Sequence, residues 1–391
     1  FSGMCEQTGR YTTKMKIKCS REQLNEIVNI VQKAIPSKAV MPILECIKLE
    51  ALGDGHIIMT GNNLDMCIVH KSECNVIEGG SVALMSKMFG EIIRKMPDGE
   101  VDITVNEENN ITKIKCGVSE FNIQGMGPNE YPDAPKINEI YKFSLSQKDL
   151  RKIIRKTVSF TAVNEGKKPV FTGALFDIKN NILNVAATDG HRLAVVKEEL
   201  EGEGDNIKFV VPGQTLREIF KILHDEDSMV NIIVSDRHAL FDFGDFQVYT
   251  RLLEGDFLRY DAIISAVNTI NLTVNKRVLM DSLERAMLLI NDDTSSSSDT
   301  KVPVRFNISY GKIDISCITG KGQVNDTVEA DIDGGDLIIG FNCRFLLDAM
   351  NVCEEDVIKM EFSAPTSGCF IKSSKDDDSY VYMVLPVRLY N

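Results

Sequence analysis

The sequence predicts an α+β fold made of three similar β-rich domains, each with two helices and antiparallel sheets. Three observations lead to this prediction: a strand-cap-helix motif that occurs three times, a second helical motif at the same spacing, and β-hairpin patterns between the two. The 391 residues are enough for two or three domains of about 150 residues each. From Met15 onward, the remaining 377 residues hold three repeats of about 126.

The first motif is an alternating strand, a capping residue and a helix with a leucine four positions after the cap. Its three copies have Ser20, Ser146 and Asn275 at the cap, spaced by 126 and 129 residues. These side chains can accept a hydrogen bond from a free N–H group in the first turn of a helix. The motif therefore predicts helices over residues 21–33, 147–157 and 275–287.

The second motif is a short amphipathic helix that follows an apolar strand. Phe89, Leu216 and Leu346 hold the same place in its three copies, which lie 127 and 130 residues apart. Because two independent markers recur at matching distances, an internal repeat explains them better than chance does. The strands are expected at 81–85, 208–211 and 337–340, and the helices at 87–97, 213–223 and 343–351.

Between its two helices, each third of the chain reads as β-hairpins, because apolar and polar residues alternate around Asn, Asp and Gly. We expect roughly eight short strands in each third. The clearest hairpins span residues 47–60, 174–187 and 306–318, with turns at Asp54-Gly55, Asn180-Asn181 and Gly311.

Proline-rich and polar segments near residues 128–138 and 265–271 mark the domain boundaries. A run of four serines predicts a mobile loop at 292–300. The expected organisation is a disordered extension at 1–14, followed by domains at 15–138, 139–268 and 269–391.

The composition excludes several classes of protein. With 43% hydrophobic and 26% charged residues, the chain is too apolar to be disordered. No run approaches the roughly 18 apolar residues that a membrane helix needs. Ten cysteines without a C-x-x-C pair indicate reduced, buried thiols in a reducing compartment. We therefore expect a soluble cytoplasmic protein with no membrane partner.

The net charge of −13 at first argues against nucleic acid as a partner. Its distribution is uneven, however: the six predicted helices carry 16 basic and 8 acidic residues, so the rest of the chain carries −21. A single basic helix is typical of a solvated face. An excess shared by repeated helices predicts instead a positive surface that attracts phosphates without reading bases. The most basic helix holds Lys148, Arg151, Lys152, Arg155 and Lys156.

An enzyme is the competing class. A phosphate-binding loop is absent, since Gly320-Lys-Gly322 lacks its frame, and the five histidines show no metal-binding spacing. Asp189 and His191 have no nucleophile motif beside them, and a turn at Gly190 explains both. We therefore predict no catalytic residue, no metal and no cofactor. A β-rich scaffold for protein partners, without DNA encirclement, stays open as an alternative.

Four segments carry a resemblance to a known family: Met15-Lys16-Ile17, Met41-Pro-Ile-Leu44, Ala187-Thr-Asp-Gly-His-Arg-Leu-Ala-Val195 and Leu385-Pro-Val-Arg-Leu389. They resemble the bacterial DNA polymerase sliding clamp, the beta subunit of the replicative polymerase, and the likeness covers nearly everything from Met15 to Leu389. It implies the DNA-clamp fold, in which a head-to-tail dimeric ring of six domains surrounds duplex DNA with its helices. A ring trapped on DNA needs no tight grip, so a weakly attractive basic lining lets it slide.

The resemblance also implies three sets of site residues. The residues expected near DNA are Arg21, Lys38, Lys87, Arg151, Lys152, Arg155, Lys168, Arg217, Lys276 and Arg277. A hydrophobic cleft for partner peptides would comprise Phe171, Thr188, Gly190, His191, Arg192, Leu193, Leu258, Ile263, Thr366, Gly368, Met383, Val384, Leu385, Pro386, Val387, Arg388 and Leu389. The dimer interface would comprise Phe121, Ile123, Leu288 and Leu289. Plain surface charges and ordinary core positions are the alternatives.

The implied role is that of a DNA replication processivity factor in the bacterial cytoplasm. Its partners would be double-stranded DNA of any sequence, the replicative polymerase alpha subunit, an ATP-dependent clamp loader, other proteins with clamp-binding motifs, and a second copy in a homodimer. Two departures from the family are visible. Phe257-Leu-Arg-Tyr260 replaces the common Phe-Pro-Asp-Tyr and is expected to change one wall of the cleft. Tyr390-Asn391 extends past the usual terminal leucine and is expected to crowd its mouth.

Overall fold

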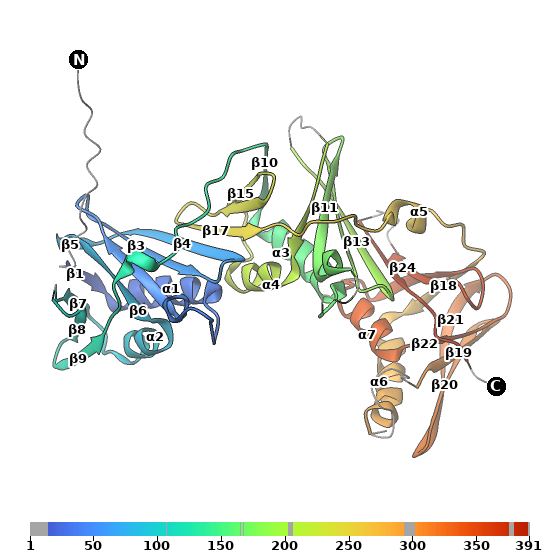
Figure 1. Cartoon of the computed structure of the whole chain (residues 1–391). Coiled ribbons are helices and arrows are strands. Elements are labelled where there is room, and N and C mark those ends of the chain that lie inside the picture. Colours follow the sequence, from blue (N-terminus) through green and yellow to red (C-terminus); the bar gives the residue numbers. More distant parts are fainter. Residues whose placement is uncertain are drawn as a thin grey trace. The chain divides into compact units, whose positions relative to one another are not determined.

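The computed structural model describes residues 15–106, 108–164, 166, 168–201, 206–292, 302–374 and 379–389. The extension expected at 1–14, nearly all of the loop expected at 292–300, and Tyr390-Asn391 lie outside the described residues. The chain divides into two compact units (Figure 1). The first unit is Phe1–Gln147 with Lys221–Leu252, and the second is Lys148–Phe220 with Leu253–Asn391.

The first unit contains two antiparallel sheets and the helices α1 (Arg21–Val31) and α2 (Ser86–Lys95), which pack against each other. One sheet has five strands in the order β5 (Asn75–Glu78), β1 (Met15–Ser20), β7 (Glu100–Val105), β8 (Ile111–Cys116) and β9 (Ser119–Gln124). The other has eight strands in the order β10 (Tyr141–Ser146), β15 (Met229–Val234), β16 (His238–Asp242), β17 (Phe246–Arg251), β4 (Met66–Glu73), β3 (His56–Asn62), β2 (Cys46–Ala51) and β6 (Gly80–Met85).

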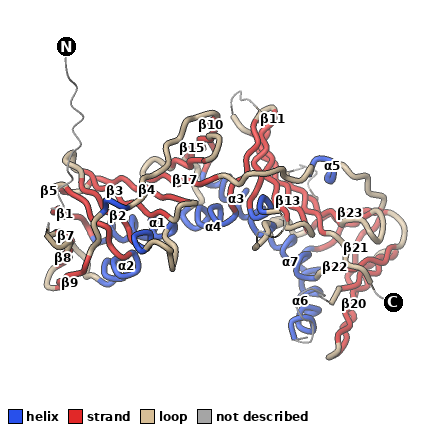
Figure 2. Tube along the Cα trace, viewed as in Figure 1, coloured by secondary structure: helices blue, strands red, loops and turns tan. Residues whose placement is uncertain are grey.

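The second unit is built on one antiparallel sheet of twelve strands. Their order is β14 (Ile207–Pro212), β11 (Gly173–Lys179), β12 (Ile182–Thr188), β13 (Arg192–Glu199), β25 (Tyr380–Val384), β24 (Cys369–Ser373), β23 (Val357–Phe362), β18 (Ile270–Asn275), β21 (Gly322–Asp333), β20 (Lys312–Thr319), β19 (Val304–Ser309) and β22 (Leu337–Phe341). The unit also holds α5 (Tyr260–Ile264), α6 (Lys276–Asp292), α7 (Cys343–Asn351) and most of α3 (Gln147–Thr157) and α4 (Gly213–Ile222). In Figure 2 the predominance of strands over helices is plain.

The two helical motifs of the sequence are confirmed. Ser20 caps α1 by accepting a hydrogen bond from the N–H of Gln23 (3.2 Å), and Asn275 caps α6 by accepting one from Val278 (3.1 Å). The second set of helices appears as α2, α4 and α7, and the marker side chains Phe89, Leu216 and Leu346 are fully buried. One length differs: α6 continues to Asp292, five residues past its expected end.

The expected hairpins form as well. Gly55, Asn180, Asn181 and Gly311 all have positive φ, between 50° and 84°, at the turns where the sequence predicts them. Such turns match the right-handed twist of the strands that they join. Among the described residues the three thirds contain nine, eight and eight strands, close to the expected eight. The described cysteines are all free and, apart from the half-buried Cys74, buried.

Candidate functional site

The centre of the candidate peptide site is the pairing of β13 with β25. This ladder runs from Arg192 opposite Val384 to Val196 opposite Tyr380. Since side chains alternate along a strand, Leu193 and its ladder partner Met383 share one face of the sheet, whereas Arg192 and Val384 belong to the other. The seam therefore separates the predicted cleft residues into two groups.

The face with Leu193 and Met383 carries an apolar cluster that also includes Val195, Phe370 and Tyr260. Partly buried side chains pack on it, among them Phe171 and Ile263 from the predicted cleft. The rings of Phe171 and Phe257 meet edge to face, with centroids 5.6 Å apart. The described structure thus brings Phe171, Leu193, Ile263 and Met383 together around one apolar surface, hereafter the apolar patch.

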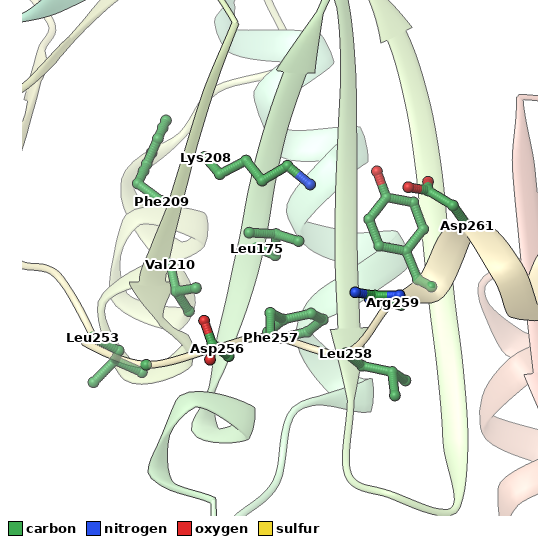
Figure 3. A pocket seen from close by; sticks show the side chains of 12 residues that line it. Leu175, Lys208, Phe209, Val210, Leu253, Asp256, Phe257, Leu258, Arg259 and Asp261 are labelled. Carbon is green, nitrogen blue, oxygen red and sulfur yellow. The ribbon is translucent and has the colours of Figure 1, made fainter.

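A pocket of about 340 Å³ adjoins the apolar patch (Figure 3). Its lining includes Leu258 of the predicted cleft together with Leu175 and Val210 of the sheet. Lys208 and Arg259 contribute positive charge, and Asp256 and Asp261 contribute negative charge, so this end of the surface is polar. An apolar surface with a few placed polar groups is the usual make-up of a site for a short peptide.

A buried carboxylate fixes the segment that covers the patch. Asp177 has no exposed surface, and its Oδ2 atom accepts a hydrogen bond from the Tyr260 hydroxyl (2.7 Å). Lys208 (3.0 Å) and Lys179 (3.2 Å) pair with the same oxygen. Burial would raise the pKa of Asp177, but the hydroxyl and the two ammonium groups outweigh it and the pKa is lowered. The sequence prediction missed these groups; the only signal was an acidic residue within an otherwise apolar strand.

The turn between β12 and β13 forms as the sequence predicts. Gly190 has φ +90°, and its N–H donates to the Thr188 hydroxyl (3.0 Å). Asp189 accepts from the N–H groups of His191 (2.9 Å) and Arg192 (3.1 Å). These short-range bonds explain the Thr-Asp-Gly-His-Arg segment as a turn that positions β13 rather than as a catalytic group.

The Arg192 guanidinium lies away from the apolar patch. It binds Asp189 (2.9 Å), Asp348 of α7 (2.6 Å) and the Ser159 carbonyl (2.8 Å), and it lies over the rings of Phe160 and Phe345. Only 8% of Arg192 is exposed. Its side chain therefore secures the helix-facing side of the β13–β25 seam.

The tail beyond β25 follows a defined path. The N–H of Leu385 donates to the His191 carbonyl (2.9 Å), and the N–H of Val387 donates to the Gly340 carbonyl of β22 (2.8 Å). Leu389 also packs on Gly340. The remaining predicted residues of this part are the half-buried Pro386 and Gly368 and the exposed Arg388 and Thr366. Gly368 lies against Met383, because a Cβ atom at Gly368 would come within 2.7 Å of the Met383 sulfur.

The predicted DNA-facing residues of the second unit differ in how far they are engaged. Lys168 and Arg277 are exposed, and Arg155 is exposed but pairs with Glu354. The half-buried members hold protein groups: Arg151 donates to the Phe220 carbonyl (3.1 Å), Lys152 lies 3.8 Å from Glu198, Lys276 donates to the Cys353 carbonyl (2.8 Å), and Arg217 donates to the Val158 carbonyl (3.2 Å). In the first unit Lys38 and Lys87 are exposed, and Arg21 pairs with Asp98.

Lys156 corrects the sequence-based view of α3. It is only 2% exposed, lies over the Tyr380 ring (4.8 Å to the centroid), and is 3.6 Å from Glu354. Burial lowers its pKa. The basic face of α3 therefore consists of Lys148, Arg151, Lys152 and Arg155, and Lys156 belongs to the core beneath it.

The predicted interface residues lie at free edges of the two units. Phe121 and Ile123 are on β9, the edge strand of the five-stranded sheet, and Phe121 is 43% exposed. Leu288, near the end of α6, is 71% exposed. Leu289 lies beside Gly322, since its Cδ2 atom would be 3.7 Å from a Cβ atom there.

Two kinds of site are not found in the part of the chain that the structure describes. No group of three or more His, Cys, Asp or Glu side chains could hold a metal ion there. Of the helices described, none has both the length and the apolar character needed to cross a membrane.

Three repeats of two helices and antiparallel β-strands, with an apolar patch on a seam between repeats, define the DNA-clamp class of protein. Family models of the DNA polymerase III beta subunit match in order: the N-terminal domain over residues 15–135, the central domain over 144–258 and the C-terminal domain over 262–388. The chain belongs to the DNA polymerase III beta subunit family.

Relatives agree with this assignment along almost the whole chain. The beta sliding clamp of Halalkalibacterium halodurans is 33% identical over 376 residues, which cover 93% of this chain and 97% of that protein. A solved structure from Eubacterium rectale superposes with a TM-score of 0.90 at 35% identity, and the DNA polymerase sliding clamp of Bacillus subtilis does so with 0.89 at 29%. Each alignment of structures covers 96% of this chain and all of the other.

Proposed function

We propose that this protein is a sliding clamp that closes around duplex DNA as a head-to-tail homodimer and tethers the replicative polymerase. Its relatives carry the name beta sliding clamp, and the solved relatives are polymerase sliding clamps, so the role is processivity and not catalysis. The relatives are bacterial, and free thiols fit a reducing bacterial cytoplasm.

The observation that carries ring closure is the way in which the repeats join. β4, the fourth strand of the first repeat, pairs with β17, the last strand of the second. β13, the fourth strand of the second repeat, pairs with β25, the last strand of the third. By the same rule β21, the fourth strand of the third repeat, would pair with β9, the last strand of the first, in another copy. Exposed strand edges are suited to such pairing.

Both of these strands have one unpaired edge within the described residues. β9 pairs only with β8, and the first eight residues of β21 pair only with β20. Every backbone N–H and C=O along these edges lacks a strand partner, so a second chain could add a ladder on each side. Because the interface is heterologous and the three repeats are similar, two chains would close a ring rather than extend a fibre.

The two existing seams also predict the register of the third. Met66 faces Thr250 in one seam, and Arg192 faces Val384 in the other. Gly322 begins β21 as Met66 and Arg192 begin β4 and β13, so it holds the corresponding place. A glycine there leaves room for a larger side chain from the facing strand.

That larger side chain is Ile123. In the last hairpin of the first repeat, Ile123 faces Thr112, and the corresponding hairpins place the seam residues of β17 and β25 at the same position. Ile123 of the partner subunit would therefore face Gly322, and Phe121 of the partner subunit would face Val324. Antiparallel pairs of apolar residues stabilise such a ladder.

Helix packing supports the same register. In the β13–β25 seam, Phe160 stacks on Tyr382 with ring centroids 5.2 Å apart. The repeat makes Leu289 the counterpart of Phe160 and Phe121 the counterpart of Tyr382. Phe121 of the partner subunit would therefore cover Leu289, which explains why an aromatic side chain is left 43% exposed on an edge strand.

Binding to DNA is assigned to the exposed basic residues of the helices and the loops beside them. Lys38, Lys87, Lys148, Lys168 and Arg277 are exposed and can contact phosphates through water or directly. Such contacts are independent of sequence and weaken as the salt concentration rises. The half-buried Arg151, Lys152, Lys276 and Arg217 would add to the positive field more than to direct contact.

The apolar patch is assigned to partner peptides. We infer that the polymerase alpha subunit, an ATP-dependent clamp loader and other proteins with clamp-binding motifs place apolar side chains between Phe171, Leu193, Ile263 and Met383. Large apolar side chains in a preformed surface account for most of the affinity at such sites.

Retention on DNA tests the proposal. The clamp, once loaded on a nicked circular plasmid, should stay bound in a wash at high salt and should leave after the plasmid is cut once. Substituting Lys148, Arg151, Lys152 and Arg155 with Glu should abolish loading, whereas Lys136→Glu, an exposed charge outside the helices, should not. Equal retention on circular and linear DNA would reject encirclement and favour the scaffold without DNA encirclement.

A further inference from the structure

A pair of cysteines lies at the end of the β1–β5 ladder, away from the surfaces described above. Ile17 faces Val76 and Lys18 faces Asn75, so the next position along the two antiparallel strands places Cys19 opposite Cys74. Residues directly opposite each other in such a ladder have Cα atoms about 4.5–5.5 Å apart. A disulfide spans Cα separations of roughly 4.4–6.8 Å, so this backbone can accept one without moving.

The side chains of the pair point the same way. Cys19 follows the buried Met15 and Ile17 on one face of β1, and opposite residues share a face. The Cys74 sulfur lies 3.3 Å from the Lys18 carbonyl, and the Cys19 thiol donates to the Gln23 side chain (2.9 Å).

The two thiols also act on each other. The neighbouring Cys74 thiol, and after it burial, raises the pKa of Cys19, whereas the Cys19 thiol lowers the pKa of Cys74. Because the thiolate is the reactive form, Cys74 is the nucleophile of the pair and Cys19 is the thiol that resolves it.

Solvent reaches this pair. The two cysteines line an open hollow of about 550 Å³ together with Lys18, Gln23, His56 and Glu100. Cys74 is the one half-buried cysteine among the described residues, and the other eight are buried. A small oxidant can therefore approach the Cys74 sulfur from the hollow, with Cys19 behind it.

We propose that Cys19 and Cys74 form an oxidisable dithiol that closes to a disulfide on reaction with a hydroperoxide. The Cys74 thiolate attacks the peroxide oxygen, which breaks the O–O bond and yields a sulfenic acid and, with one proton, water. The Cys19 thiol then attacks the Cys74 sulfur, forms the S–S bond and releases the second water. Two thiols and one hydrogen peroxide thus give one disulfide and two waters, and a dithiol reductant reverses the change.

Peptide mapping of the full chain tests this. The reduced protein is treated with hydrogen peroxide, free thiols are alkylated, and the linked peptides are identified by mass spectrometry. The Cys19–Cys74 link should exceed any other pair by at least about tenfold, because the other described thiols are buried. The link should disappear on treatment with dithiothreitol, and the linked chain should melt at a higher temperature because it closes a long loop.

Variants separate the two roles. Cys19→Ser should stop at a Cys74 sulfenic acid that dimedone traps, Cys74→Ser should form neither product, and Cys317→Ser, at a buried thiol, should behave as wild type. Absence of the Cys19–Cys74 link in the wild-type protein, or linkage of the buried cysteines to the same extent, would overturn the proposal. The wild-type measurement decides the matter even if a variant fails to fold.

Discussion

The β4–β17 seam of the first unit and the β13–β25 seam of the second are built on the same backbone pattern. In one, the Asn62 side chain accepts from the N–H of Leu64 (2.7 Å); in the other, the Thr188 hydroxyl accepts from the N–H of Gly190 (3.0 Å). Leu64 and Gly190 both have positive φ, 77° and 90°. The same turn therefore serves both seams, although a leucine adopts it only at a cost in free energy.

The strand that leaves each seam is held in the same way. The N–H of Arg251 donates to the Asp65 carbonyl (2.8 Å), and the N–H of Leu385 donates to the His191 carbonyl (2.9 Å). The correspondence extends to a hydrogen bond between residues that differ completely in side chain. The backbone geometry of the seam thus does not depend on whether the surface above it is apolar.

The surfaces above the seams are different. The first seam carries a pocket of about 130 Å³ lined by polar groups such as Asp65, His238, Tyr249 and Arg251. The second carries the apolar patch, on which Phe257 and the rest of the covering segment pack. The comparison teaches that the repeat supplies the frame, whereas the covering segment and the side chains make one seam suitable for an apolar peptide.

The largest effect is expected at the seam that only a second copy can complete. Phe121→Asp would place a charge against Leu289 of the partner subunit, and we expect the dissociation constant of the dimer to rise by at least about 100-fold. Sedimentation equilibrium measures this. Val118→Asp, at a fully exposed position two residues before β9's centre, is the control and should leave the dimer intact. A dimer unchanged by Phe121→Asp would refute the proposed register.

The next effect concerns the two surfaces. Phe171→Ala removes a partly buried ring from the apolar patch and should weaken binding of a clamp-binding peptide by about 10–100-fold, as for a hot-spot residue. Leu64→Ala, an exposed apolar residue on the first seam, should change the affinity by less than about twofold. Fluorescence anisotropy with a labelled peptide compares them, and equal losses would mean that the two seams do not differ in function.

The buried carboxylate provides a third test. Asp177→Asn removes the charge that Lys208 and Lys179 share, and we expect a loss of about 1–2 kcal/mol in the free energy of unfolding. Because the pKa of Asp177 is lowered in the folded state, its contribution is present above the unfolded pKa of about 3.9 and is lost as the pH falls through the folded value. Urea titrations between neutral pH and pH 3 should show a flatter dependence in the variant.

Glu50 supplies the matched control for that test. It lies on β2, at the place of the first seam that corresponds to Asp177, and it pairs with Lys48 (3.1 Å) while remaining partly exposed. Glu50→Gln should therefore cost less than about 1 kcal/mol, because exposed ion pairs contribute little. A cost as large as that of Asp177→Asn would show that burial does not distinguish the two positions.

The smallest effects test the shared turn. Gly190→Ala should destabilise the protein by about 1 kcal/mol through backbone strain alone, because no atom lies within 4 Å of the added Cβ. Leu64→Gly relieves the same strain but adds flexibility to the unfolded chain, so we expect a gain of at most about 0.5 kcal/mol. Chemical denaturation measures both, and opposite signs are the expected outcome. A destabilised Leu64→Gly variant would mean that the leucine packs usefully despite its conformation.

Much of the fold could be predicted because its signals are local. The caps at Ser20 and Asn275 depend on a residue three positions away, and the hairpin turns at Asn180-Asn181 and Gly311 on their own φ preferences. The turn at Gly190 is equally local. The threefold repeat follows from recurring motifs that any sequence reader can count, and it fits the family to which the chain belongs.

Tertiary structure alone decided which side of each element a residue serves. Lys156 looks like a member of a basic helix face, yet Tyr380, more than 200 residues away in the chain, covers it. Arg192 looks like a cleft residue, yet Asp348 and the Ser159 carbonyl hold it on the opposite face. Asp177 carries no sequence motif at all, and only its contact with Tyr260 reveals its role. Burial and charge pairing are set by segments distant in the sequence, so the local pattern determined the elements and the packing determined the sites.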